Sequence, residues 1–243
     1  MTNEVRPTAA KRPTAFALVM AGLVLVFLSL GTWQVQRLFW KLDLIARVDA
    51  RVHAEPVIVP TPADWPRITV ESDEYRHVTA TGTFLNDRET LVQAVTDLGP
   101  GFWVLTPLQT ADRGTILINR GFVPAEKREA ASRAAGEING ETKVTGLLRL
   151  TEPGGGFLRA NDPAGNRWYS RDVAAIAAAR GVANIAPYFI DADKTPNAGG
   201  YPVGGLTVVT FRNSHLVYAL TWYALAAMSA GAFVYLLRQR RSA

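Results

Sequence analysis

The sequence predicts a membrane protein in which two transmembrane helices flank an α+β, predominantly antiparallel β domain outside the cytoplasm. Two uncharged, largely apolar runs of 24 residues, Pro13–Gln36 and Ser214–Leu237, bracket the chain. Each exceeds the roughly 20 residues that a helix needs to cross a bilayer. The stretch between them alternates apolar with polar side chains over short distances, which is typical of strands.

These features divide the chain into five parts. We expect a cytoplasmic tail (1–13), a first transmembrane helix (14–36), an outside domain that begins with a juxtamembrane helix (37–213), a second transmembrane helix (214–237) and a cytoplasmic tail (238–243). Two buried core helices are the alternative interpretation of the apolar runs. Their length and lack of charge favour the membrane.

The charge distribution supports this topology. The chain has 26 basic and 21 acidic residues, a net charge of +5. Residues 1–36 carry +2 and residues 214–243 carry +3, whereas residues 37–213 hold 20 of each sign. The positive-inside rule therefore predicts that both tails are cytoplasmic, although Arg37 and Lys41 weaken the signal of the first span. Because the excess charge follows from topology, we expect the lipid bilayer as a partner and no nucleic acid.

The absence of cysteine limits the chemistry that the chain can perform. It excludes thiolate catalysis, CxxC redox chemistry and c-type haem attachment. Because no disulfide can form either, the outside domain must be held together by its own core.

The first run is too long for the apolar part of a secretory signal, and no cleavage pattern follows it, so we expect an uncleaved anchor. The short tail with Glu4 does not resemble an organellar import peptide. We therefore expect a bacterial inner (plasma) membrane protein with a periplasmic domain.

The first helix is expected to continue outward to about His53 and to end before Pro56, because apolar residues recur there at helical spacing. Strands are expected in seven stretches: 75–84, 89–95, 102–109, 115–119, 143–150, 186–191 and 206–212. Residues 111–114 are predicted to form a hairpin loop. The elements predict a compact sheet or a partly closed barrel.

One helix should interrupt the strands, with Ser170 as its N-cap, Asp172 in its first turn and Gly181 at its end. Farther back, Arg120 follows an apolar strand, and we expect it to pair locally in a structural role. The adjacent Gly121 should have a positive φ or a close backbone neighbour.

His215 opens the second apolar run, where ionisable residues are costly and often functional. On a helix it shares one face with Tyr218, Ala219 and Trp222. A neutral imidazole among large aromatic side chains suits an axial ligand to haem iron. An interfacial aromatic belt with one tolerated histidine accounts for the same pattern, and the residues alone do not decide between the two.

The end of the first run carries a matching group of residues: Trp33, Gln36, Arg37 and Trp40. Arginine pairs well with carboxylates such as the propionates of a haem. Taken alone, this group is explained more simply by an aromatic belt with a snorkelling arginine.

The sequence contains no GxSxG, HExxH or SxxK pattern, so we expect no enzyme. The run 154–156 of three glycines lacks the lysine of a phosphate loop and reads as a flexible loop. His53 and His77 are expected at the surface. Asp73–Glu74 and the pair Asp191 and Asp193 are expected to be solvated charges at strand ends.

Four segments together resemble the Surfeit locus protein family. They are Gly31-Thr32-Trp33-Gln34 with Arg37 and Trp40-Lys41; Thr106-Pro107-Leu108 with Ile118-Asn119-Arg120-Gly121-Phe122-Val123-Pro124; Trp168-Tyr169-Ser170-Arg171-Asp172; and Asn213-Ser214-His215-Leu216-Val217-Tyr218-Ala219-Leu220-Thr221-Trp222. The resemblance covers the chain nearly end to end. Phe122 departs from the family's usual Trp, and Val217 departs from its usual Gln.

The resemblance implies an assembly factor for haem–copper (cytochrome c) oxidase that binds haem a as transient cargo and assists its delivery to the oxidase's catalytic subunit. It implies His215 as the iron ligand, with Tyr218, Trp222, Trp33 and Arg37 around the haem, and a haem a synthase as the possible donor. A membrane chaperone or tether that never touches haem is the alternative. A membrane-anchored periplasmic enzyme is a third interpretation, which the missing catalytic pattern disfavours.

Overall fold

The computed structural model describes residues 12–156 and 158–241. Within them the chain forms two compact units. The first, the helix pair, comprises residues 12–46 and 210–241, and the second, the β domain, comprises residues 47–209.

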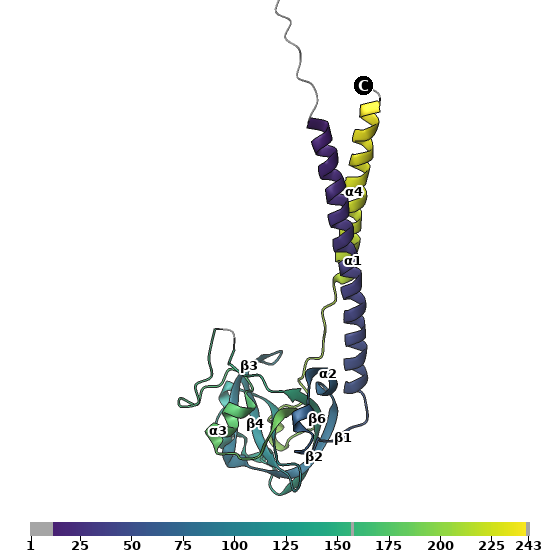
Figure 1. The fold of residues 1–243 in the computed structure, drawn as a ribbon. Coiled ribbons are helices and arrows are strands. Elements are labelled where there is room, and N and C mark those ends of the chain that lie inside the picture. The colour runs from purple at the N-terminus through teal and green to yellow at the C-terminus, as the bar shows by residue number, and fades with distance from the viewer. Residues whose placement is uncertain (1–11, 157, 242–243) are drawn as a thin grey trace, which may run out of the picture. The chain divides into compact units, whose positions relative to one another are not determined.

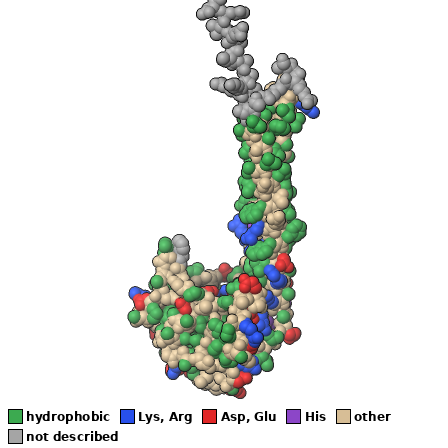
Figure 2. Space-filling view, viewed as in Figure 1, with side chains coloured by type: hydrophobic (Ala, Val, Ile, Leu, Met, Phe, Trp, Pro, Cys, Tyr) green, Lys and Arg blue, Asp and Glu red, His purple; other side chains and the backbone are tan. Residues whose placement is uncertain are grey.

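The helix pair consists of most of α1 (Arg12–Val52) together with α4 (His215–Arg241). Both helices are long and apolar enough to cross a membrane. Hydrophobic side chains gather over them in the space-filling view (Figure 2). Only 11% and 6% of the most apolar windows of the two helices are buried, which argues against their being core helices of a soluble protein. The first helix ends four residues before Pro56, as expected from the sequence.

Small side chains let the two helices pack as antiparallel neighbours (Figure 1). Gly31 of α1 lies against the ring of Tyr223 of α4, and a Cβ at this position would stand 2.7 Å from the ring carbon Cε1. Ala219 and Ala226 of α4 are buried. Close approach of backbones at small residues is the usual way in which membrane helices associate.

The β domain contains a seven-stranded sheet in the order β1-β2-β6-β7-β5-β4-β3. The strands are β1 (Val57–Ile58), β2 (His77–Phe84), β3 (Thr90–Thr96), β4 (Gly99–Gln109), β5 (Thr115–Pro124), β6 (Glu141–Leu150) and β7 (Ile185–Ala192). Six of the seven expected strands are therefore present. A short helix, α2 (Val70–Asp73), precedes β2.

The sheet closes into a barrel because the end of β2 also pairs with the end of β4, through Thr83↔Gln109 and Phe84↔Leu108. The closed ring comprises β2, β6, β7, β5 and β4, while β1 and β3 extend it. Most pairs are antiparallel, as expected, but β1–β2 and β5–β7 are parallel. The fold is therefore a closed barrel rather than a simple antiparallel sheet.

Alternate side chains of the strands point into the barrel. On β2 the buried positions are Val78, Ala80, Gly82 and Phe84, the side expected from the period-two pattern. They pack on residues such as Ile118 and Leu148. The outer face of β5 and β7 is also buried, because α3 (Val173–Arg180) covers it with Val173 and Ile176. Strands covered on both faces read as nearly continuous apolar runs, which is the pattern of β5.

Two expectations about local structure are wrong. The N-cap of α3 is Asp172, whose carboxylate accepts the N–H of Ala175. Ser170 instead accepts from the N–H of Gly155 through its hydroxyl. Residues 206–212 form no strand. The chain there passes the end of β7, which is already flanked by β5 and β6, so no strand edge is available to it.

Gly121 meets both conditions expected of it. Its φ is +126°, and a Cβ would stand 2.1 Å from the carbonyl oxygen of Val203. The residue does not close a turn, however, because β5 runs on to Pro124 and Phe122 pairs with Val203.

Candidate functional site

His215 begins α4 and faces α1. Its Nδ1 lies 2.7 Å from Oε1 of Gln34. Because an amide oxygen only accepts hydrogen bonds, Nδ1 carries the proton and Nε2 keeps its lone pair. Metal-bound histidines commonly donate their second ring nitrogen in this way, which fixes the tautomer and the ring orientation.

The sequence analysis named Gln34 only within the first segment of the family resemblance, and the group that it matched to His215 contained Gln36 instead. A signal was present: Phe27, Gly31 and Gln34 recur at helical spacing, and all three face α4 in the structure. Gln36 is exposed. A polar residue that shares a helix face with a small residue, as Gln34 does with Gly31, therefore indicates the face that meets the neighbouring helix better than Gln36 does.

The aromatic residues expected around His215 divide into two groups. Trp222 stacks on Phe27 of α1, with ring centroids 5.7 Å apart. Tyr218 and Trp33 point away from the helix contact, with 54% and 51% of their surface exposed. Trp222 therefore belongs to the contact between the helices, whereas Tyr218 and Trp33 present open aromatic surface.

Arg37 lies over the ring of Trp40, one turn farther along α1, at 4.2 Å from its centroid. Within residues 12–156 and 158–241, no hydrogen bond or ring contact joins Arg37 or Trp33 to His215. The same ranges contain no group of three or more His, Asp or Glu side chains that could hold a metal ion.

The β domain contains a second polar constellation, on the outer face of the barrel. Asp191 of β7 is 3% exposed. Its carboxylate accepts from Asn119 at 2.7 Å, from Arg149 at 3.1 Å, from Arg171 at 3.0 Å and from Thr207 at 3.0 Å. We call these five residues the Asp191 cluster. It joins two of the four sequence segments that carry the family resemblance, through Asn119 and Arg171.

The expectation of a solvated charge is therefore wrong for Asp191, and it is also wrong for Asp73, which is buried and paired with Arg76. Asp193 is partly exposed. Burial in the Asp191 cluster lowers the pKa of Arg149, but the attraction of Asp191 outweighs it and leaves this pKa above its usual value. A cation held so firmly has a structural role.

His77 is also more enclosed than expected. Its Nε2 lies 2.8 Å from a carboxylate oxygen of Asp193, and its Nδ1 lies 2.8 Å from the carbonyl oxygen of Ala54. Burial lowers the pKa of His77, but the hydrogen bonds to Asp193 and Ala54 outweigh this effect, so the pKa lies above its ordinary 6.5.

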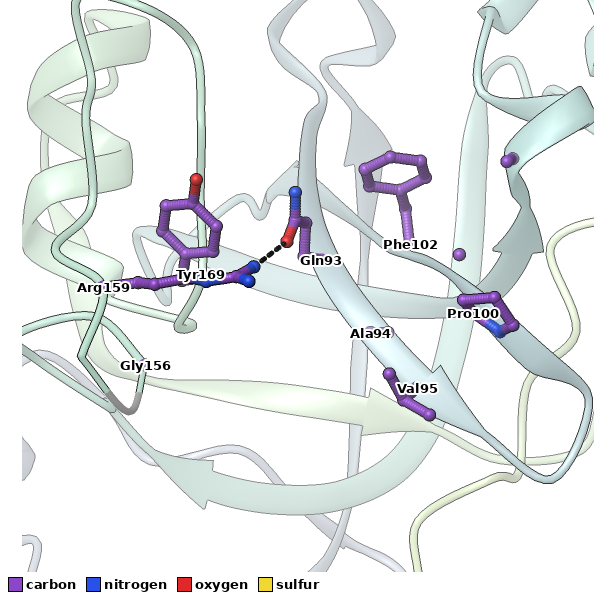
Figure 3. A pocket seen from close by; sticks show the side chains of 10 residues that line it. Gln93, Ala94, Val95, Pro100, Phe102, Gly156, Arg159 and Tyr169 are labelled. Carbon is purple, nitrogen blue, oxygen red and sulfur yellow. Dashed lines mark hydrogen bonds between the residues drawn. The ribbon is translucent and has the colours of Figure 1, made fainter.

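A groove of about 560 Å³ lies beside the hairpin formed by β3 and β4. We call it the β3–β4 groove. Its lining is mainly apolar and includes Val95, Pro100, Phe102 and Tyr169. Figure 3 shows Arg159 extended toward Gln93, and its guanidinium donates to the Gln93 amide oxygen at 3.3 Å. Gly156, the last residue of the glycine run expected to be a loop, also lines the groove.

The chain belongs to a class of proteins in which a closed β-barrel domain is inserted between two helices. Both helices are apolar enough to cross a membrane. The model of the SURF1 family matches residues 21–227 of the chain. Surfeit locus protein 1 of Mus musculus is 42% identical over 217 residues, which cover 83% of this chain and 69% of the relative. The chain belongs to the SURF1 family, and the resemblance drawn from the sequence segments is confirmed.

Other relatives agree with this assignment. Surfeit locus protein 1 of Homo sapiens is 39% identical over 244 residues, covering 93% of this chain and 79% of the relative. A SURF1-like protein of Monosiga brevicollis is 38% identical over 253 residues, covering 98% and 94%. The similarity therefore extends over both helices and the barrel.

Proposed function

We propose that this chain is an assembly factor for haem–copper (cytochrome c) oxidase. In this role it binds haem a as cargo, takes it from a donor such as a haem a synthase, and assists its delivery to the oxidase's catalytic subunit. The role is not catalytic. Membership of the SURF1 family supports the proposal, and the hydrogen bond between His215 and Gln34 is the observation that carries it.

The fit of His215 to haem rests on its tautomer. Nδ1 donates to Gln34, so Nε2 is left as a neutral nitrogen donor. Such a nitrogen is a standard axial ligand to haem iron. His215 would hold the iron, and Gln34 would fix the orientation of the imidazole.

The neighbouring side chains would hold the rest of the cargo. Trp33 and Tyr218 present apolar aromatic surface to a porphyrin edge, and Trp222 is braced by Phe27. Arg37 lies over the ring of Trp40, and the N–H groups of its guanidinium would pair with a propionate. An exposed pair of this kind contributes modestly, about 0–1 kcal/mol.

The proposed location is a bacterial inner membrane, with both termini cytoplasmic and residues 38–213 periplasmic. The two apolar helices and the positive charge of the tails support this orientation. A reporter that is active only in the periplasm, fused after Pro124, should be active, whereas the same reporter fused after Ala243 should be silent. The reverse pattern would place haem transfer in the wrong compartment and overturn the proposal.

The test of haem binding compares three variants of the full chain purified from membranes that make haem a. His215→Ala should lose or shift the Soret absorption without loss of protein. Gln34→Leu should shift the spectrum and lower haem occupancy, because the imidazole loses its orienting acceptor. Gln36→Leu is the matched control, since Gln36 is exposed on the same helix, and its spectrum should not change.

An unchanged spectrum in His215→Ala would mean that another residue supplies the ligand, and His215 would then be part of an aromatic belt. Wild-type protein that carries no Soret band, but whose removal still stops oxidase assembly, would favour the alternative function. In that case the chain is a membrane chaperone or tether for an oxidase subunit.

A further inference from the structure

The free edge of β3 beside the β3–β4 groove has the properties of a docking site for an extended peptide. In an antiparallel ladder the N–H and C=O of one residue point to the same side, and this side alternates along the strand. The N–H of Gln93 points away from β4, because it donates to the carbonyl oxygen of Trp168 at 2.9 Å. Val95 stands two residues farther along β3, so its backbone groups point the same way.

The register of the hairpin supports this orientation. Val95 is opposite Pro100 of β4, and proline has no N–H to offer to the carbonyl of Val95. The segment that contains Trp168 pairs with β3 only at Val92 and Gln93. Among the described residues, the backbone N–H and C=O of Val95 have no hydrogen-bond partner.

The side chains at this edge do not protect it. Natural sheets usually blunt free edges with lysine, proline or a covering loop. The exposed edge of β3 carries Val95, whose side chain is 85% exposed, and the next charge is Asp97 in the turn. Leu98 in the same turn is also exposed. An uncharged edge with outward backbone groups is a template for an added strand.

The groove beside the edge favours a partner segment that carries negative charge. Arg159 is the one charged side chain among the described residues that line it. Its guanidinium lies 5.5 Å from the centroid of Tyr169, and Arg128 lies 5.2 Å from the centroid of Phe102. Arg159 in the lining, together with Arg128 beside the lining residue Phe102, favours carboxylates in whatever binds there.

We propose that the free edge of β3 and the β3–β4 groove bind an extended segment of a partner protein as an added strand. Apolar side chains of the segment would lie over Val95, Pro100 and Phe102, and an acidic side chain would pair with Arg159. This docking site is independent of haem, and it goes beyond the proposed function.

The test uses full-length protein in detergent and three dye-labelled pentapeptides, with binding measured by fluorescence anisotropy. The first alternates valine with glutamate, the second alternates valine with lysine, and the third is the glutamate peptide with N-methylated backbone nitrogens. The glutamate peptide should bind at least about tenfold more tightly than either of the others. Equal binding of the lysine peptide would overturn the role of Arg159, and equal binding of the N-methylated peptide would overturn strand addition.

Variants of the protein provide the second arm. Val95→Pro removes the outward N–H without breaking a bond to β4, and it should weaken the glutamate peptide about tenfold. Leu98→Ser is the matched control in the same hairpin and should bind normally. Arg159→Gln should abolish the preference for glutamate over lysine. If no peptide binds to a wild-type protein with normal thermal unfolding, or if Val95→Pro binds as well as wild type, the proposal is wrong.

Discussion

In the helix pair, the side chains that join α1 to α4 are small, aromatic or neutral and polar, whereas the β domain buries full charges. Within the described part of the helix pair, two side-chain hydrogen bonds connect the helices, from His215 to Gln34 and between Thr32 and Tyr223. In the β domain, the Asp191 cluster holds one buried carboxylate between two guanidinium groups.

This difference changes what a polar contact means in each unit. On helices that are apolar enough to cross a membrane, a polar side chain has few partners and is costly without one, so the contact of His215 with Gln34 is the reason for proposing a functional site there. In the barrel, charged side chains have partners on several strands. A buried ion pair there is therefore interpreted as support for the fold. The same residue type must therefore be judged by the unit in which it lies.

The largest effect on stability is expected at Gly121, where the barrel has no room for a side chain. Gly121→Glu forces a side chain into the carbonyl of Val203 and requires a positive φ as well. We expect a loss of about 4 kcal/mol or more in unfolding free energy, measured by thermal unfolding and protease resistance of the full chain. Gly140→Glu is the control, because Gly140 has φ of +81° but open space around its Cβ. It should cost about 1–3 kcal/mol, and equal losses in both variants would contradict the steric account.

The Asp191 cluster should give the next largest effect. Asp191→Asn keeps the shape of the side chain but removes the buried carboxylate between Arg149 and Arg171. The two arginines then keep only Glu74 and the partly exposed Glu152 as acidic partners. Breaking a buried ion pair from one side costs about 3–5 kcal/mol, measured by chemical unfolding of the full chain. Asp162→Asn breaks an exposed pair with Arg167 and should change stability little. If the two variants lose the same amount, the cluster is not the buried support that its geometry indicates.

A smaller effect, with a defined pH dependence, is expected from His77. Its pKa is raised in the folded state, so the pair with Asp193 stabilises the fold below the ordinary pKa of 6.5, and this contribution is lost as the pH rises through the folded pKa. His77→Gln should therefore cost about 1 kcal/mol below pH 6 and progressively less above it. His53→Gln is the control, since His53 is exposed beside Asp49. A pH-independent difference between wild type and His77→Gln would contradict the pairing.

The sequence predicts those parts of the fold that depend on local patterns. The first helix ends before Pro56, and the inward face of β2 follows the alternation of its residues. The positive φ of Gly121 was expected for a glycine that follows an apolar strand, although the strand in fact continues through it. Each of these features is set by neighbours along the chain. Residues 206–212 show the limit, because they have the Val, Thr and aromatic content of a strand but pair with no strand in the part of the chain that the structure describes.

Features that depend on distant segments could not be predicted in this way. The barrel closes through two residue pairs between β2 and β4, which leave no mark in either strand. Asp191 gains its partners from β5, β6 and the segment before α3. At the helix pair, His215 was identified as a candidate because a histidine is unusual at membrane depth. Its contact with Gln34 required the register of the two helices.

The smallest effect is expected at the second polar contact of the helix pair, where Thr32 Oγ1 and the hydroxyl of Tyr223 lie 3.2 Å apart. Hydrogen bonds between membrane helices contribute about 0.6 kcal/mol on average, because the separated helices also find partners. Tyr223→Phe keeps the ring against Gly31 and should lower stability by about that amount in an SDS titration followed by tryptophan fluorescence. Tyr235→Phe is the matched control on the same helix, since the Tyr235 hydroxyl accepts from Gln239 of α4 and not from α1. A loss of more than about 2 kcal/mol for Tyr223→Phe alone would mean that the helix pair depends on polar contacts as the barrel does, and the contrast between the two units would fail.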